Sequence, residues 1–261
     1  MWGVALLLGL VEGATEFLPI SSTGHLILTS WLLDFHGPRA EVFEIFIQIG
    51  AILAVVVEYR ARFTALVLDL PRRAEARAFA VRIALAFLPA AVLGLLAHHF
   101  IAEHLFSPRT VALALIAGAL LILLVEGLRL QARTHSTDDM SWHQAVGVGL
   151  AQCLALWPGF SRSAATILGG LGMGLDRRSA TEFSFFLAVP TLVAASGYDL
   201  LKNAKHLEAG DALWLTVSTL VSFAVAWASI RWLLRYVSTH DFRAFAWYRI
   251  ALGAIVLLTL R

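Results

Sequence analysis

One polar stretch near the amino terminus decides the fold: Val11-Glu12-Gly13-Ala14-Thr15-Glu16-Phe17-Leu18-Pro19-Ile20-Ser21-Ser22-Thr23-Gly24-His25. It separates two strongly apolar runs, 2–10 and 26–33, and a proline in its middle breaks the helical pattern. Each apolar run is shorter than the roughly 20 helical residues that cross a bilayer core. The stretch therefore predicts a re-entrant helical hairpin over residues 1–34, with its turn covered by protein or by a water-filled cavity.

The composition indicates a membrane protein. The chain has 261 residues, of which 59% are hydrophobic and 15% are charged, whereas soluble domains are about 25% charged. Apolar runs recur along the whole chain and predict an all-α polytopic membrane protein. A net charge of +2 is too small to favour a nucleic-acid partner, and the single cysteine, Cys153, excludes an intramolecular disulfide framework.

About six further segments have the length and apolarity of transmembrane helices: 42–59, 82–98, 110–127, 181–198, 213–234 and 246–260. Two shorter apolar runs, 142–156 and 161–175, are separated by Trp157-Pro158-Gly159-Phe160. Because neither run is long enough to cross, they predict a second re-entrant hairpin over residues 142–175.

The two hairpins resemble each other. Gly9-Leu10-Val11-Glu12 aligns with Gly149-Leu150-Ala151-Gln152, and Pro19 aligns with Pro158 at nearly the same offset. This pattern predicts two repeats within one membrane domain, residues 1–135 and residues 141–261, each with one hairpin and three crossings. Three is an odd number, so the second repeat is inverted and the hairpin tips meet near the middle of the bilayer.

Basic residues predict the orientation. Lys and Arg are concentrated in the segments 60–82, 128–143, 176–181 and 231–249. The positive-inside rule places these segments in the cytoplasm. Both termini are then expected on the outer side of the membrane, with hairpin one entering from outside and hairpin two from inside.

Two carboxylates predict a metal site. Glu12 and Glu16 are one helical turn apart and share a face. Close carboxylates in a low-dielectric setting bind a cation or share a proton, and Mg²⁺ or Ca²⁺ suits such oxygen ligands. The alternative is a pair of solvated acids at a watery helix end.

Ser21, Ser22 and Thr23 follow the proline turn and begin the second half-helix. Helix capping alone explains one of them. Together they are typical of an anion site at a helix N-terminus, so we expect them to bind substrate. His25 lies three residues after Ser22, which suggests a hydroxyl nucleophile beside its base; alternatively His25 is itself the nucleophile.

The second hairpin supplies Ser161, Arg162, Ser163 and Thr166. Arg162 is expected to be the one basic residue buried in an apolar region, where it needs an anionic partner. Its guanidinium matches a phosphate group; the alternative is a structural ion pair with Glu12 or Glu16. An arginine, two half-helix N-termini and a cation meeting at one point favour phosphoryl transfer on a lipid phosphate.

The motif Glu12 to His25 and the motif Pro158-Gly159-Phe160-Ser161-Arg162-Ser163 closely resemble the two motifs of the undecaprenyl pyrophosphate phosphatases, the bacitracin-resistance family. The resemblance extends over the whole chain, including 46–54 and 182–190. It implies hydrolysis of a C55 isoprenyl pyrophosphate to the monophosphate, which recycles the lipid carrier for peptidoglycan. It also implies dependence on a divalent cation, a bacterial inner-membrane location and a site open to the periplasm.

The resemblance also implies roles for single residues. Metal and acid–base roles fall to Glu12 and Glu16, a nucleophile–base pair to Ser22 and His25, and the phosphate clamp to Arg162. Further substrate contacts fall to Ser161, Ser163 and Thr166. One departure is Ala164, which stands where the family motif usually has glycine.

Two other functions stay open. Inverted repeats with broken helices also form transporters, so the chain is alternatively a transporter or flippase for a lipid phosphate or another anion. A purely structural membrane protein leaves Arg162 and the two glutamates without a purpose. The choice of metal, the preferred prenyl chain length and the formation of a homo-oligomer are not decided by the sequence.

Overall fold

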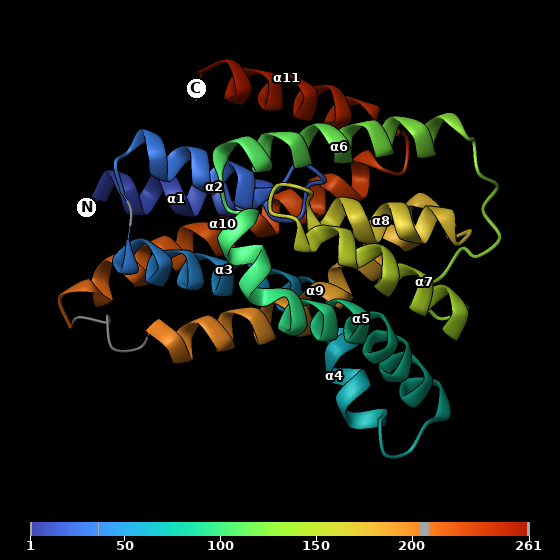
Figure 1. Cartoon of the computed structure of the whole chain (residues 1–261). Coiled ribbons are helices and arrows are strands. Elements are labelled where there is room, and N and C mark those ends of the chain that lie inside the picture. Colours follow the sequence, from blue (N-terminus) through green and yellow to red (C-terminus); the bar gives the residue numbers. More distant parts are fainter. Residues whose placement is uncertain (1, 36, 204–208, 260–261) are drawn as a thin grey trace.

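The computed structural model describes residues 2–35, 37–203 and 209–259, which form helices joined by short turns and by one longer connection, residues 128–141 (Figure 1). Five described helices are long and apolar enough to cross a membrane: Ala40–Glu58, Ala74–Ile101, Pro108–Gly127, Arg177–Lys202 and Ala212–Tyr236. Large apolar side chains such as Leu96 and Leu220 lie exposed on the outside of these helices, as expected for contact with lipid. The prediction of an all-α polytopic membrane protein is confirmed.

The helices follow the predicted order. The first half of the chain contains α1 (Trp2–Thr15), α2 (Ser22–Leu32), α3 (Pro38–Glu58), α4 (Arg60–Asp69), α5 (Ala74–His104) and α6 (Pro108–Gly127). The second half contains α7 (Trp142–Gln152), the 3₁₀ helix η1 (Cys153–Leu156), α8 (Arg162–Gly172), α9 (Arg177–Asn203), the 3₁₀ helix η3 (Ala209–Asp211), α10 (Ala212–Tyr236) and α11 (Arg243–Thr259). Five of the six predicted crossings correspond to α3, α5, α6, α9 and α10. The sixth, 246–260, falls in α11, whose 17 described residues are not among the helices long and apolar enough to cross, and residue 260 lies outside the described residues.

The segment 60–82 differs from the expected loop, because it contains α4 and the beginning of α5. In α4, arginines at positions 60 and 62 alternate with apolar residues, and Val67 and Leu68 are exposed. The segment predicted as a loop is therefore largely helical, in α4 from residue 60 to residue 69 and in α5 from residue 74 onward.

The two hairpins approach the centre of the helix bundle from opposite ends (Figure 1). Each second helix, α2 and α8, has 11 residues and begins after a serine, Ser21 or Ser161. Both serines have left-handed backbones, with φ of 74° and 77°, and both accept a hydrogen bond from the N–H three residues on, at 3.2 Å. Because this conformation is uncommon for a residue other than glycine, its occurrence in both hairpins supports the predicted duplication, which stays a prediction.

Close packing of helices surrounds the hairpins. Helix α10 packs against α1 and α3, α9 packs against α3 and α8, and α11 lies along α6 (Figure 1). At the α1–α10 contact, a Cβ atom on Gly13 would lie 2.6 Å from the carbonyl oxygen of Ser222. The two backbones therefore approach closely because position 13 carries no side chain.

This contact predicts a difference between two glycines of α1. In Gly13→Leu the new side chain collides with backbone atoms of α10, which costs about 1–3 kcal/mol and lowers the apparent melting temperature by roughly 3–10 °C in a chain of this size. In the control Gly3→Leu nothing lies within 4 Å of the added Cβ, so the melting temperature stays close to that of the wild type. Thermal unfolding of the purified proteins in detergent measures both. Equal melting temperatures for the two variants would contradict the packing argument.

Candidate active site

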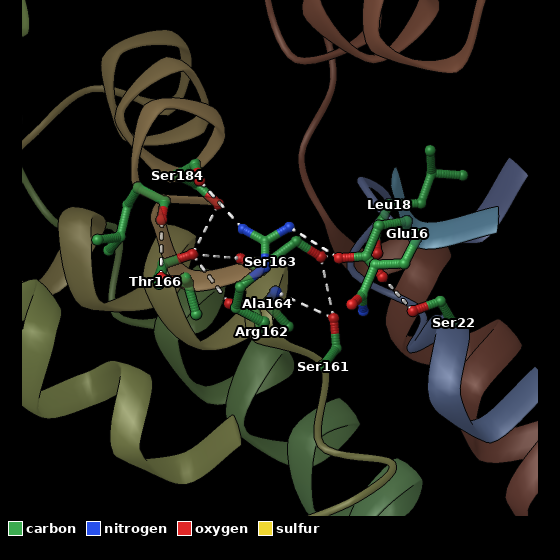
Figure 2. A network of polar contacts seen from close by, with 12 residues as sticks. Glu16, Leu18, Ser22, Ser161, Arg162, Ser163, Ala164, Thr166 and Ser184 are labelled. Carbon is green, nitrogen blue, oxygen red and sulfur yellow. Dashed lines mark hydrogen bonds and ion pairs between the residues drawn. The ribbon is translucent and has the colours of Figure 1, made fainter. Parts of the chain in front are cut away.

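Glu16 joins the two hairpins at the centre of the bundle (Figure 2). Its Oε1 accepts a hydrogen bond from Arg162 Nη2 at 3.1 Å, and its Oε2 accepts one from the Ser22 hydroxyl. The side chains of Glu16 and Arg162 are only 7% and 10% exposed. The structure therefore forms the ion pair that was considered as an alternative for Arg162, and the same carboxylate holds the Ser22 hydroxyl.

Arg162 is held on two sides by hydrogen bonds from its two Nη atoms. Its Nη1 donates to the Ser184 carbonyl at 3.0 Å, opposite the bond to Glu16 (Figure 2). Its Nε is buried and has no hydrogen-bond partner among the described residues. A buried donor without an acceptor is unfavourable, so this N–H group is suited to an oxygen atom of a ligand.

The hydroxyls of the second hairpin form a chain of hydrogen bonds (Figure 2). Ser163 Oγ donates to the Leu18 carbonyl of the first hairpin at 2.7 Å and lies 3.0 Å from Ser161 Oγ. Thr166 Oγ1 donates to the Arg162 carbonyl at 2.9 Å and lies 2.7 Å from Ser184 Oγ. Ser163 therefore joins the hairpins, while Thr166 supports the backbone of Arg162 and the residue to which Arg162 binds.

A cavity of about 90 Å³ lies between the two turns. Its lining contains six of the predicted site residues, Glu16, Ser21, Ser22, Thr23, Ser161 and Arg162. The rest of the lining consists of Gln48, Ala155, Pro158, Gly159 and Leu192. Glu12, His25, Ser163 and Thr166 are not part of this lining. Ala164, at the position where the sequence departs from the expected motif, is fully buried. Its N–H donates to Ser161 Oγ, which caps α8.

Glu12 is buried beside the cavity with no partner in the described part of the chain. It is 1% exposed, and neither of its carboxylate oxygens has a hydrogen bond among these residues. The Glu16 N–H donates to the Glu12 carbonyl at 2.9 Å, which extends the helical turn through both acids. Unpaired buried carboxylate oxygens suit a hard cation. No group of three or more His, Cys, Asp or Glu that could hold a metal occurs in residues 2–35, 37–203 and 209–259.

His25 lies three residues after Ser22 but makes its hydrogen bonds to other residues. Its Nδ1 lies 2.7 Å from the Ser21 carbonyl oxygen, and its Nε2 lies 2.6 Å from the Tyr248 hydroxyl of α11. The Ser22 hydroxyl binds Glu16 in place of the predicted imidazole. The roles assigned to Ser22 and His25 stay predictions.

Arg249 of α11 is the principal residue that sequence reasoning missed. It is 0% exposed, and its guanidinium donates at 2.7–3.3 Å to the carbonyl oxygens of Pro19, Ala114, Leu115, Gly159 and Phe160. The expectation that Arg162 is the one buried basic residue is therefore wrong. Arg249 lies inside α11, whereas the side of the membrane on which the segment 231–249 lies stays a prediction. Arg82 is also largely buried and donates to the Asp138 carbonyl at 2.6 Å.

Two other contributing residues were not singled out, although they lie in the stretches 46–54 and 182–190 that carry the family resemblance. Gln48 of α3 lines the cavity, and Ser184 of α9 accepts from Arg162. Each is an ordinary polar residue within an apolar helix. For Arg249 the available signal was its place inside the predicted crossing 246–260, where a basic residue requires a partner.

The fold and the site define a class of protein: a multi-pass membrane protein with a small, polar cavity between the turns of two helical hairpins. Residues 5–255 match the family of the bacitracin resistance protein BacA. Over nearly its whole length the chain is also similar to curated relatives, and it belongs to this family.

Three of these relatives show how extensive the similarity is. The undecaprenyl-diphosphatase of Nitrosospira multiformis is 54% identical over 97% of this chain and 93% of the relative. The undecaprenyl-diphosphatase 2 of Rhodospirillum rubrum is 54% identical over 98% of this chain and 93% of the relative. The undecaprenyl-diphosphatase of Methylococcus capsulatus is 52% identical over 99% of this chain and 94% of the relative.

Arg249 predicts a large effect on stability. Arg249→Met keeps much of the side-chain volume but leaves carbonyl oxygens of both turns without donors, which costs about 3–5 kcal/mol when a buried network of this kind is broken. We expect a clear loss of thermal stability in detergent together with loss of activity. The matched control is Arg243→Met in the same helix, whose guanidinium is half exposed and pairs only with Asp241 at 3.6 Å; it should change stability by less than about 1 kcal/mol. A stable, active Arg249→Met protein would show that Arg249 does not hold the turns.

Proposed function

We propose that the chain hydrolyses undecaprenyl pyrophosphate to undecaprenyl phosphate and inorganic phosphate, an acid-anhydride hydrolysis that recycles the lipid carrier for peptidoglycan and confers resistance to bacitracin. The observation that carries the proposal is Glu16, which binds the Ser22 hydroxyl and the Arg162 guanidinium at one small buried cavity. Phosphoryl transfer requires a nucleophile, a proton acceptor and a positively charged side chain that binds phosphate, and Ser22, Glu16 and Arg162 match these three groups. The names of the relatives agree with this chemistry.

We propose Ser22 as the nucleophile, because it lines the cavity whereas His25 does not. As Ser22 Oγ bonds to the terminal phosphorus, its proton passes to Glu16, and the phosphorus–oxygen bond of the anhydride breaks. The electron pair of that bond leaves with undecaprenyl phosphate. Water then attacks the phosphoserine, which releases inorganic phosphate, and the proton on Glu16 returns to Ser22.

The remaining groups bind and orient the pyrophosphate. The Nε–H of Arg162, which has no partner among the described residues, donates to a phosphate oxygen. The Nη2 group, which pairs with Glu16 in the described structure, then binds phosphate in place of Glu16. Ser21, Thr23 and Ser161 face the same cavity and supply hydroxyls. Ser163 and Thr166 support the site through Leu18 and Ser184.

We propose that Glu12, together with Glu16, holds a divalent cation, Mg²⁺ or Ca²⁺. Its two unpaired, buried carboxylate oxygens support this assignment. When bound, such a cation neutralises negative charge on the pyrophosphate. The protein's part is to hold two acids on adjacent turns of one buried segment next to the cavity.

The location of the site explains why a lipid substrate fits. The hairpins lie inside a bundle whose outer surface is apolar, so an isoprenyl tail can stay in the bilayer while the pyrophosphate enters. We propose a bacterial inner-membrane location with both termini and the opening of the site on the periplasmic side. The distribution of Lys and Arg along the sequence supports this orientation.

Substitution of Ser22 tests the proposed nucleophile. Purified protein with Mg²⁺ or Ca²⁺ releases phosphate from a C55 polyprenyl pyrophosphate, and Ser22→Ala lowers the rate at least about 100-fold. The matched control is Ser30→Ala in the same helix, which removes another buried hydroxyl, one without a partner among the described residues, and leaves the rate within about twofold. Full activity of Ser22→Ala would refute the nucleophile. Absence of phosphate release by the wild type, with movement of the lipid across liposome membranes, would favour the transporter alternative.

Removal of the divalent cation tests the proposed metal site. Chelation with EDTA abolishes phosphate release, and added Mg²⁺ or Ca²⁺ restores it. Glu12→Gln keeps the shape of the side chain but removes its charge, so it requires at least about tenfold more cation for half-maximal rate. The matched control is Glu103→Gln, an exposed acid at the end of α5. An unchanged cation requirement in Glu12→Gln would exclude Glu12 as a ligand.

A further inference from the structure

His25 is held between two oxygen atoms from distant parts of the chain. Its Nδ1 lies 2.7 Å from the Ser21 carbonyl oxygen, and its Nε2 lies 2.6 Å from the Tyr248 hydroxyl. A carbonyl oxygen only accepts hydrogen bonds, so the proton of the neutral imidazole is on Nδ1. Nε2 then carries the lone pair, and the Tyr248 hydroxyl donates to it. The two contacts together select one tautomer of His25.

The Ser21 carbonyl belongs to a strained residue. With φ at 74°, Ser21 has a left-handed backbone that a residue with a Cβ atom adopts only when its surroundings hold it there. Its side chain caps α2 through the Gly24 N–H at 3.2 Å, and its carbonyl accepts from the His25 backbone N–H at 3.3 Å and from the His25 Nδ1–H at 2.7 Å. The next residue is Ser22, whose hydroxyl lines the cavity and binds Glu16. The direction of Ser22 therefore depends on the conformation of Ser21, which His25 stabilises.

The position of Tyr248 is fixed by its neighbour in sequence. Arg249 Nη1 donates to the Pro19 carbonyl at 3.0 Å, so two successive residues of α11 hold Pro19 directly and Ser21 through His25. The rings of Tyr248 and His25 are parallel to within 2°, with centroids 5.6 Å apart. Tyr248 is not among the residues that line the cavity. Its hydroxyl therefore acts on the site through His25 and not by contact with phosphate.

We propose that Tyr248 is a positioning residue for the proposed phosphatase: by holding His25 in one tautomer against the Ser21 carbonyl, it sets the direction in which the Ser22 hydroxyl enters the cavity. The inference rests on the proposed function. It gives His25 a task that needs neither proton transfer nor a bond to phosphorus. Tyr248, a residue of α11, thus helps to hold the turn of the first hairpin in its conformation.

Removing the Tyr248 hydroxyl tests the proposal. Tyr248→Phe keeps the ring and removes one hydrogen bond, so kcat falls about five- to tenfold while KM changes less than about twofold, because Arg162 and the cavity lining are untouched. The matched control is Tyr198→Phe in α9, whose ring contacts His98 and Lys202 away from the site; its kcat stays within about 1.5-fold of the wild type. A changed KM with unchanged kcat would overturn the positioning role.

A double-mutant cycle tests whether the effect passes through His25. Tyr248→Phe should cost nothing further in the His25→Ala background, because the hydrogen bond is already lost. Equal losses in both backgrounds would overturn the proposal. His25→Asn keeps an N–H group near the position of Nδ1, so it should recover part of the activity lost in His25→Ala and be insensitive to Tyr248→Phe. An Asn variant as inactive as the Ala variant would assign a chemical role to Nε2 instead.

A measurement without turnover separates this inference from the proposed function. In protein labelled with ¹⁵N-histidine, the His25 signals are those that disappear in His25→Asn. They should report a protonated Nδ1 and an unprotonated Nε2, and the shift of Nε2 should change in Tyr248→Phe but not in Tyr198→Phe. A protonated Nε2 in the wild type would overturn the inference. If the wild type releases no phosphate, the proposed function fails, while these signals still test the His25–Tyr248 contact.

Discussion

The guanidinium of Arg249 holds the two hairpins together. A re-entrant hairpin has a turn at its tip, and the carbonyl oxygens of that turn cannot all bond within a helix. In a bilayer they must be satisfied by protein, and Arg249 donates to Pro19 in one turn and to Gly159 and Phe160 in the other. One buried charge thereby replaces water at both turns. The carbonyls of Ala114 and Leu115 in α6 complete its surroundings.

With the turns satisfied in this way, the buried polar groups that still lack a hydrogen-bond partner among the described residues include those of two residues of the proposed site: both carboxylate oxygens of Glu12 and the Nε of Arg162. They carry opposite charges, which suits a cation and an anion bound side by side, as in a metal–pyrophosphate complex. The ion pair between Arg162 and Glu16 fits the same interpretation, because it keeps two charges compensated where no ligand separates them.

The sequence predicted what depends on local pattern. The turns at Pro19 and Pro158, the helices that cross the membrane, and the convergence of Glu16, Ser22 and Arg162 follow from apolar run lengths and from the cost of burying charge. Contacts between distant segments did not follow. Arg249 looked like one more basic residue near a cytoplasmic loop, because nothing local shows that five carbonyl oxygens from three segments surround it.

The imidazole of His25 is a second case in which the sequence did not predict the contacts of a side chain. Helical spacing places His25 within reach of Ser22, but spacing does not decide which of several acceptors each nitrogen takes. The Ser21 carbonyl is four residues back along the chain and Tyr248 is 223 residues away. Only the folded arrangement shows that Glu16 takes the Ser22 hydroxyl and leaves His25 to the backbone. A catalytic pair inferred from sequence spacing is therefore a statement about reach, and the competing donors and acceptors of the fold determine the actual pairing.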